Sequence, residues 1–560
     1  MKSLAVCCAV GLLVAGAAAH QAQAQGAPPP PLPLGAPPVP AQNPLTNAKI
    51  KLGETLFWEE QLSITGTVAC GTCHRGFGGG ADPRTALAGA DSHSPGPDAV
   101  FGGADDIGGS LGVPAHSLDG TYLSTAAFGL DAQVGTRRAM SAIDAAYSPL
   151  LFWDGRAGNS FTDPDTNTVL IPQGAALENQ ALGPLLNNVE MAYSGAASAS
   201  IGQRLDSAQP LALATNVPAA LQTWIAGRRY PALFQEAFGT SERSAAHIAM
   251  AIASYERTLV ATQTPFDAQN GGTPNSLTAQ EQRGQQVFVA NDCAACHAGA
   301  LLSDNQFHYD GVRPVTDDLG RFVQTGNNPD RGAFRTPSLR NAALRGPYMH
   351  NGRLATLADV VEFYNRGGDF TAPNKDPRVR PRNLNTQQKA DLVAFIGRPF
   401  VDPRAAAETA PFDRPTLFTE SDRAPHLIGS GVAGSGALIP QIGAVEPPLL
   451  GNRNFTVAVT NALGAATATL VVSHTDPGIA ATLPGGDFAS LDITLSGSGA
   501  GNGYASVNVD LGDNPVLLGQ TLYGRFYIAD PSAPNQLAIT PAFTITVFGD
   551  GDAMFINGFE

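Results

Sequence analysis

Two Cys-x-x-Cys-His runs limit what this chain of 560 residues can fold into more than any other feature of its sequence. Two thiols three positions apart can each form a thioether to one vinyl group of the same haem, and the histidine that follows can then ligate the iron. We therefore predict two covalently bound haem c groups. The residues predicted to hold them are Cys70, Cys73 and His74 in the first run, and Cys293, Cys296 and His297 in the second.

Other uses of these cysteines fit less well. A zinc site would need four ligands drawn from both runs, and nothing else in the sequence presents a closed set of four cysteines. A redox dithiol would leave the following histidine unexplained in both runs. Haem attachment alone does not decide function, because a haem ligated on both sides transfers electrons, whereas one with an open position can react with peroxide or oxygen.

The N-terminus has the layout of an exported protein. Residues 1–24 start with a basic residue, continue with an apolar run and end in small residues, which is typical of a secretory signal peptide. Cys7 and Cys8 lie inside this segment and are expected to leave with it. No later stretch is long and apolar enough for a spanning helix, so we expect a soluble protein in the periplasm or outside the cell.

The charge balance argues against nucleic acid as a partner. The formal net charge is -15, and only 14% of the residues are charged. A nucleic-acid-binding chain would instead carry a basic surface to neutralise phosphates. An acidic chain would suit a basic soluble partner, such as a small electron carrier, although acidity is more often a matter of solubility alone.

The pattern of apolar residues changes along the chain. Residues 25–44 form a proline-rich linker, and residues 45–401 are mainly helical with long loops. We divide this part into an N-terminal haem c domain (45–240) and a C-terminal haem c domain (241–401). Helices are expected from Ser244 as an N-cap, and over 278–289, 357–364 and 387–396.

After residue 401 the helical period disappears. Residues 402–445 are rich in proline and alanine and are predicted to connect domains. Between 446 and 548 apolar and polar residues alternate, with glycine- and asparagine-rich turns between the runs. This pattern predicts an immunoglobulin-like β-sandwich. Residues 549–560 are expected to be a solvated tail, because their Gly-Asp-Gly-Asp run lacks the remaining ligands of a calcium loop.

Seven ordered motifs resemble the bacterial family of dihaem cytochrome c peroxidases and MauG, over about residues 45 to 400. The resemblance implies that the N-terminal haem is the peroxide site and that the C-terminal haem supplies its electrons. The motifs are Leu52 to Phe57, Phe152 to Arg156, Gln180 to Pro184 leading to Glu190 and Met191, Glu256 to Leu259, Pro265 to Asp267, Pro337 to Asn341, and Pro347 to Gly352.

Three residues take site roles from this resemblance. Trp153 resembles the tryptophan that lies between the two haems and relays charge, and Gln180 and Glu190 resemble the pair above the N-terminal iron. Peroxide cleavage needs a base that takes a proton from one oxygen and returns it to the other, and a buried carboxylate is suited to this. A neighbouring amide can orient the oxidant without titrating.

The expected ligand opposite His297 is Tyr364. In the peroxidase branch of the family a methionine lies fourteen positions after the histidine of the Pro-Tyr-x-His motif, here His350, whereas the MauG branch has a tyrosine there. A phenolate stabilises ferric and higher-valent iron and should lower the haem potential relative to methionine. The alternative is that Tyr364 only packs on its helix and that Met349 is the ligand.

Three features depart from the family pattern. His93 lies 19 positions after His74 in an expanded loop, so it is only a candidate for the removable sixth ligand, and His116 is a weaker one. The family's calcium-site asparagine is replaced by Arg138, a cation that would repel calcium, which makes calcium a doubtful cofactor. An insertion also separates Arg156 from Gln180.

The leading hypothesis is therefore a periplasmic dihaem oxidoreductase that reduces hydrogen peroxide with electrons from a small redox partner such as a cytochrome c or a cupredoxin. The alternative is a MauG-like enzyme that oxidises side chains of a partner protein, which Tyr364 favours. A non-enzymatic dihaem electron carrier and a dioxygen-using enzyme on the same scaffold are two further readings.

Overall fold

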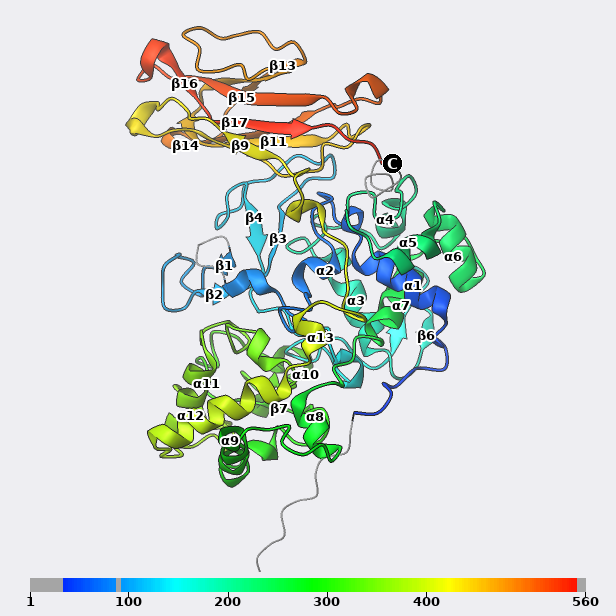
Figure 1. The fold of residues 1–560 in the computed structure, drawn as a ribbon. Coiled ribbons are helices and arrows are strands. Elements are labelled where there is room, and N and C mark those ends of the chain that lie inside the picture. Colours follow the sequence, from blue (N-terminus) through cyan, green and yellow to red (C-terminus); the bar gives the residue numbers. More distant parts are fainter. Residues whose placement is uncertain (1–33, 87–91, 551–560) are drawn as a thin grey trace, which may run out of the picture.

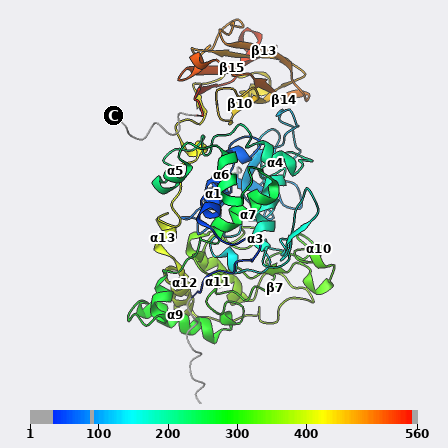
Figure 2. The same ribbon diagram turned by 90° about the vertical axis from the view of Figure 1, so that its right-hand side faces the viewer.

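The computed structural model describes residues 34–86 and 92–550. The predicted signal peptide with Cys7 and Cys8, the first part of the proline-rich linker and residues 551–560 of the tail lie outside the described residues. Three parts of the chain are stacked in Figure 1. We call them the N-terminal helical region (34–261), the second helical region (262–401) and the C-terminal β region (425–548). Figure 2 shows that the N-terminal helical region lies between the other two.

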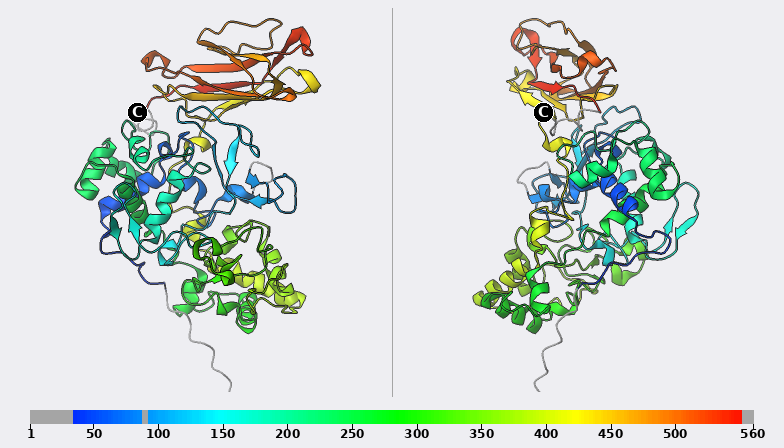
Figure 3. Two further views of the ribbon diagram at one scale, coloured as in Figure 1. Left: turned by 180° about the vertical axis from the view of Figure 1, so that it is seen from behind. Right: turned by 45° about the vertical axis from the view of Figure 1, so that its right-hand side comes forward.

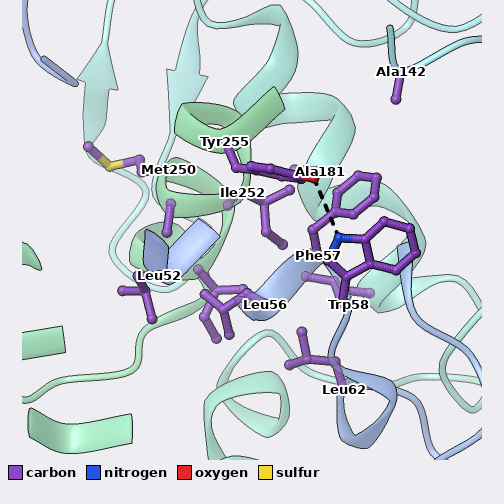
Figure 4. Packing of buried hydrophobic residues seen from close by; sticks show 14 of the residues in the cluster. Leu52, Leu56, Phe57, Trp58, Leu62, Ala142, Ala181, Met250, Ile252 and Tyr255 are labelled. Atoms are coloured by element: carbon purple, nitrogen blue, oxygen red, sulfur yellow. Dashed lines mark hydrogen bonds between the residues drawn. The ribbon is translucent and has the colours of Figure 1, made fainter. Parts of the chain in front are cut away.

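Two helices cross at the centre of the N-terminal helical region. They are α1 (Asn47–Phe57) and α7 (Ala245–Glu256). A Cβ atom on Gly53 would lie 1.9 Å from the carbonyl oxygen of Ala251, so only glycine allows the two backbones to approach this closely. At one end of this contact the indole of Trp58 donates to the hydroxyl of Tyr255 over 3.4 Å (Figure 4).

Shorter helices complete this region. They are α2 (Cys70–Cys73), α3 (Ala176–Leu186), α4 (Ala199–Gln203), α5 (Ala219–Ile225) and α6 (Tyr230–Phe238). The helix α7 begins at the predicted N-cap, since the Ser244 hydroxyl accepts from the amide of His247. It nevertheless belongs to the N-terminal helical region, although the predicted division at residue 241 assigns it to the second haem domain. Eleven of its twelve residues are buried, because α1 and α3 cover it from different sides.

The second helical region is built around α9 (Ala279–Ala290), α11 (Leu357–Arg366) and α12 (Thr386–Ile396). These helices confirm the three predicted ones. Each starts with a capping box, in which the side chain of Thr278, Thr356 or Asn385 accepts from a backbone amide of the first turn. The smaller helices α8 (Pro265–Asn270) and α10 (Phe322–Thr325) lie beside them, and β7 (Phe307–His308) pairs with β8 (Phe334–Arg335).

The long glycine-rich stretch after the first cysteine run is mostly loop, as predicted, but it contains short paired strands. Strand β1 (His93–Ser94) pairs with β2 (Ile107–Gly108), and β3 (Leu111–Pro114) pairs with β4 (Ala132–Val134). The insertion before Gln180 forms a further pair, β5 (Phe161–Thr162) with β6 (Val169–Ile171).

Two antiparallel sheets form the C-terminal β region and share one apolar core. The first sheet has the order β10-β11-β14, and the second has the order β13-β12-β15-β17-β9, with β16 paired to β15. The immunoglobulin-like arrangement remains a prediction. The strands are β9 (His426–Ile428), β10 (Gln441–Ala444), β11 (Phe455–Gly464), β12 (Thr467–Ser473), β13 (Ala489–Thr494), β14 (Gly499–Val509), β15 (Thr521–Ala529), β16 (Leu537–Ile539) and β17 (Ala542–Thr546).

Strands β9 and β10 fall inside the predicted linker 402–445, so the sheets start earlier than expected. These strands are short, and each gains its hydrogen bonds from a distant partner, β17 for β9 and β11 for β10. The rest of the predicted linker is a connecting segment (402–424) that contains α13 (Pro403–Ala406) and runs back over the N-terminal helical region. The amides of Thr416 and Phe418 donate to the Thr215 carbonyl over 2.8 Å and to the Glu60 carboxylate over 2.7 Å.

The connecting segment explains the stacking order. It leads the chain away from the second helical region and places the C-terminal β region against the N-terminal helical region, as Figure 3 shows from two sides. Within residues 34–86 and 92–550, no helix has the length and apolar character needed to cross a membrane.

Candidate active site

The first cysteine run opens onto a cavity in the N-terminal helical region. Two adjoining hollows share Cys73 and His74 as lining residues, and we call them together the first cavity. Nδ1 of His74 lies 3.0 Å from the carbonyl oxygen of Gly80, and burial lowers the pKa of the imidazole. A neutral ring that is held at Nδ1 presents Nε2 as the metal-binding atom.

The second run has the same construction. Cys293, Cys296 and His297 line a second cavity, enclosed by the helices of the second helical region. Nδ1 of His297 lies 3.0 Å from the carbonyl oxygen of Leu302, and burial again lowers the pKa of the ring. Both runs thus place a neutral histidine and a pair of free cysteines on the wall of a cavity.

The polar groups around the cavities fit two haems with their propionates. Oε2 of Glu256 is buried without a hydrogen-bond partner, and burial raises the pKa of this residue of the first cavity wall to about 8, so that the protonated group can donate a hydrogen bond to a bound carboxylate. Nε of Arg335 is likewise unpartnered, and Arg335 lines the second cavity together with Arg345, a partly buried cation. In the described part of the chain neither arginine forms an ion pair, and burial lowers the pKa of each to about 10. Unpaired guanidinium groups beside a cavity are suited to carboxylates of a bound group.

Gln180 and Glu190 both line the first cavity, together with His74. Gln180 lies on α3, and Glu190 lies on the turn that follows this helix. Nδ2 of Asn187 donates to Oε1 of Glu190 over 3.2 Å and so orients the carboxyl group. Burial raises the pKa of Glu190, and the nearby charge of Arg156 opposes this shift. Gln180 and Glu190 thus line the same cavity, although strands β5 and β6 are inserted before them in the chain.

Trp153 is the one residue of the described chain that lines both cavities. Its indole N–H donates to the carbonyl oxygen of Arg138 over 2.8 Å. Its own carbonyl oxygen accepts from the amide of Arg335 over 2.8 Å. The ring is thus held from the N-terminal helical region at one end, while its backbone is bonded to the second helical region.

Arg138 connects the two helical regions at the same place. Its amide donates to the carbonyl oxygen of His350 over 2.8 Å. Its guanidinium group donates to the carbonyl oxygens of Pro347 and of Asp82, the latter over 3.2 Å. Burial lowers the pKa of Arg138 to about 10, so the group stays a cation at neutral pH. A positive charge therefore occupies the position where the family resemblance implies a calcium-site asparagine.

Tyr364 and Met349 both line the second cavity, so the geometry brings both ligand candidates to the same space. The hydroxyl of Tyr364 donates to Oδ2 of Asp310 over 3.3 Å. Burial and the charge of Asp310 raise the pKa of the phenol. The ring of His350 stacks on Phe334 with a centroid distance of 3.7 Å, and burial lowers its pKa to about 3.

The two weaker histidine candidates lie elsewhere. His93 belongs to β1, where it pairs with Gly108, and it is absent from the described lining of the first cavity. His116 is buried against Tyr122, with a ring centroid distance of 4.7 Å, on the side that faces the C-terminal β region.

Sequence reasoning missed three charged groups on the cavity walls, namely Glu256, Arg335 and Arg345. Glu256 stands in the Glu-Arg-Thr-Leu motif, but the side chain that pairs in the structure is that of Arg257, which binds Glu178 over 2.9 Å. The neighbouring residues in the sequence do not show whether a glutamate lies inside a cavity or on the surface. The signal that was available is that Glu256 ends an otherwise apolar helix.

Comparisons with known proteins find matches over both helical regions. Residues 47–275 match the family described as di-haem cytochrome c peroxidase, and residues 281–398 match cytochrome c. The cytochrome-c peroxidase IdrP1 of Denitromonas iodatirespirans is 31% identical, over 71% of this chain and 92% of its own. The methylamine utilization protein MauG of Methylorubrum extorquens is 30% identical, over 66% of this chain and 82% of its own. A crystal structure of a MauG-like protein associated with microbial copper homeostasis is 27% identical with a TM-score of 0.49, over 68% of this chain and 97% of its own.

Proposed function

This chain belongs to the di-haem cytochrome c peroxidase and MauG family, and we propose that it reduces hydrogen peroxide at the first cavity with electrons that enter at the second. As a member it is an oxidoreductase with two covalently bound haem c groups. The cysteines and histidines of the two runs hold these groups, which supply the iron-centred redox chemistry. We place the protein in the periplasm or outside the cell, and we propose a small soluble redox protein as the electron donor.

The position of Trp153 carries the proposal, because it is the one described residue that lines both cavities. An indole between two redox centres offers a polarisable path for charge. The hydrogen bonds at its N–H and at its carbonyl oxygen hold it from both helical regions. We assign Trp153 the role of relay between the second cavity and the first.

Glu190 and Gln180 have different roles towards peroxide: Glu190 transfers the proton, and Gln180 orients the molecule. The raised pKa of Glu190 brings the carboxyl group closer to the pH at which it can both accept and return a proton. Asn187 holds one carboxyl oxygen, which leaves the other for the substrate. The Gln180 amide donates or accepts a hydrogen bond without titrating, so it orients the peroxide while Glu190 moves the proton.

A second candidate function is a MauG-like oxidation of side chains on a partner protein. The observation that favours it is Tyr364 on the wall of the second cavity. As a phenolate ligand it would stabilise the oxidised state of the second haem. The site would then share an oxidising equivalent between the haems instead of passing on low-energy electrons, and the substrate would be a protein.

One titration separates these functions. The protein with both haems ferric is mixed with hydrogen peroxide, with and without a reduced cytochrome c, and followed by absorption spectroscopy. Rapid oxidation of the cytochrome supports the peroxidase function. A long-lived oxidised species that turns over the cytochrome poorly supports the MauG-like function. A complete lack of reaction with peroxide would contradict both.

A further inference from the structure

We propose that the C-terminal β region positions the wall of the first cavity by holding a hairpin of the N-terminal helical region. The hairpin comprises residues 111–134, with β3 and β4 at its base and a tight turn around residues 117–121 at its tip; we call it the docking hairpin. In Figure 1, β3 and β4 lie in the N-terminal helical region, and the loop beyond them extends towards the C-terminal β region. The proposal rests on the proposed function of the first cavity and gives the β region a role in it.

The tip of the docking hairpin is bonded to strands β11 and β14. The amide of Tyr122 donates to the hydroxyl of Ser506 over 3.0 Å, and the hydroxyl of Thr456 donates to the carbonyl oxygen of Gly120 over 3.2 Å. Nδ2 of Asn508 donates to the carbonyl oxygen of Asp119 over 3.1 Å. Three residues of the tip, at positions 119, 120 and 122, therefore have partners on the sheet, which fixes the register of the tip against it.

The strands present a suitable face because side chains alternate along a strand. On β11, Phe455, Val457 and Val459 point into the core between the two sheets, whereas Thr456 and Ala458 point outwards. The outward Ala458 is only 5% exposed, because Tyr122 and Leu130 of the docking hairpin cover it. An outer sheet face without the hairpin would leave this residue in solvent.

A buried carboxylate forms the centre of the contact. Oε1 of Glu446 accepts from the hydroxyl of Tyr122 over 3.0 Å, and its Oε2 accepts from the amide of Thr456 over 3.0 Å. Nε2 of His116 lies 3.9 Å from the same carboxylate, and the His116 ring packs edge-on against Tyr122. Each of these four residues is less than 10% exposed. A buried carboxylate is costly without its donors, so separation of the two parts would leave it poorly satisfied.

The base of the docking hairpin touches the segment that carries Glu190. The amide of Val113 donates to the carbonyl oxygen of Val189 over 3.0 Å, and Nε2 of Gln133 donates to the carbonyl oxygen of Asn188 over 2.9 Å. A Cβ atom on Gly112 would lie 1.9 Å from the carbonyl oxygen of Val189, so the two backbones are in direct contact. Gly112 and Leu111 themselves line the first cavity.

These contacts form a continuous path from the C-terminal β region to the proposed proton carrier. The sheet holds the tip, the paired strands connect the tip with the base, and the base supports residues 188 and 189 beside Glu190. A shift of a catalytic group by about 1 Å can cost roughly 100-fold in rate, so a support of this kind matters for peroxide reduction. We assign Glu446 and Tyr122 as positioning residues.

The test uses the full chain with both haems. Ala458→Arg places a charged side chain in the contact, whereas on an undocked sheet the same side chain would lie harmlessly in solvent. We expect faster amide hydrogen exchange in residues 111–135. We also expect changed rates at the N-terminal haem for both peroxide reaction and cyanide binding, with the peroxide rate lower by roughly tenfold or more. The spectrum of the C-terminal haem should not change.

Two further variants keep the result interpretable. Ala529→Arg, at an exposed position at the end of β15 in the other sheet, is the matched control and should behave like the unmodified protein. Tyr122→Phe removes one donor from Glu446 and should give the same changes to a smaller extent, even if Ala458→Arg does not fold. Unchanged exchange in residues 111–135 would overturn the docking.

Faster hydrogen exchange, with unchanged rates of peroxide reaction and cyanide binding at the N-terminal haem, would overturn the positioning role. If the unmodified protein does not react with peroxide, the proposed function fails. Hydrogen exchange and cyanide binding would still decide whether the β region holds the cavity wall.

Discussion

The indole N–H of Trp153 donates to the carbonyl oxygen of Arg138 over 2.8 Å, at the point where the two helical regions meet. The guanidinium group of Arg138 extends from there to the carbonyl oxygens of Pro347 and Asp82. Arg138 thus has two roles: its backbone holds the indole of the proposed relay, and its side chain places a buried cation beside it. Arg138 lines the first cavity, and Trp153 lines both cavities.

Replacing the indole should separate electron supply from peroxide binding. In Trp153→Phe we expect the rate of cytochrome c oxidation to fall by roughly tenfold or more, which corresponds to a barrier increase of about 1.4 kcal/mol. Ligand binding to the N-terminal haem should stay unchanged. Stopped-flow absorption measures both, and Trp224→Phe is the control, because Trp224 bonds to Glu236 on the surface. Equal rates in the two variants would contradict the relay role.

Removal of the carboxyl group at position 190 should abolish proton transfer to and from peroxide. We expect Glu190→Gln to lower the peroxide rate by roughly 100- to 10,000-fold. Because burial raises the pKa of Glu190 and the base is the ionised form, the rate of the unmodified protein should rise with pH through a value above the ordinary carboxyl range. In Glu190→Gln this rise of the peroxide rate with pH should disappear. The control is Glu236→Gln, on the surface of α6, in which the peroxide rate should still rise with pH.

The ligand of the C-terminal haem can be identified by its spectrum and potential. If Tyr364 ligates as a phenolate, Tyr364→Phe should change the absorption spectrum and raise the potential of this haem, because the phenolate stabilises the ferric state. Tyr348→Phe is the control, since Tyr348 lines the same cavity. Unchanged spectra in Tyr364→Phe, together with altered spectra in Met349→Leu, would assign the ligand to Met349 instead.

Calcium chelation should have no effect on this enzyme. The buried guanidinium of Arg138 supplies a positive charge between the cavities and would repel a divalent cation. We expect the peroxide rate and both haem spectra to be the same before and after treatment with a chelator. Arg138→Asn should lower the free energy of unfolding by about 1–3 kcal/mol, because the carbonyl oxygens of Pro347 and Asp82 lose their donor. A loss of activity on chelation would show that the ion is needed after all.

The stability of the fold should depend on the pH through Glu60. Burial raises the pKa of Glu60 to about 8, whereas in the unfolded chain it is about 4.3. Between these values the folded protein holds a proton that the unfolded chain has lost, so stability should fall as the pH rises. In Glu60→Gln this slope should be reduced and the stability at pH 8 higher, by an amount on the order of 1–3 kcal/mol.

Denaturant unfolding at several pH values would measure this effect. The exposed Glu242→Gln is the control and should leave the slope unchanged. An identical slope in Glu60→Gln would show that Glu60 is ionised in the folded protein, with the amide of Phe418 as its main partner.

The features that sequence reasoning predicted well depend on residues close together in the chain. The helices α9, α11 and α12 have their capping residues within the first turn, and the haem runs are contiguous. The features it missed depend on distant partners. The division at residue 241 failed for α7 because a helix that is apolar on all sides does not reveal which neighbours cover it. Strand β9 has only three residues and is defined by pairing with β17, more than a hundred positions later.

The same distinction applies to the candidate site. Trp153, Gln180 and Glu190 stand in motifs, and all three line the first cavity, while their roles remain predictions. The missing hydrogen-bond partner of Glu256 Oε2, and the lack of an ion-pair partner for Arg335 and Arg345 among the described residues, can be seen only in the folded structure. The docking hairpin cannot be told from a long loop in the sequence, since its partners on β11 and β14 lie more than 300 positions away.

The connecting segment has a consequence for how the protein is made. Ala405, Phe412 and Leu417 are part of the same apolar core as Leu52 and Leu56, although they follow the second haem run in the chain. The N-terminal core is therefore complete only after the chain has been made as far as residue 417, which lies beyond both haem runs. Attachment at Cys70 and Cys73 can thus take place while this core is still incomplete, and the connecting segment completes it afterwards.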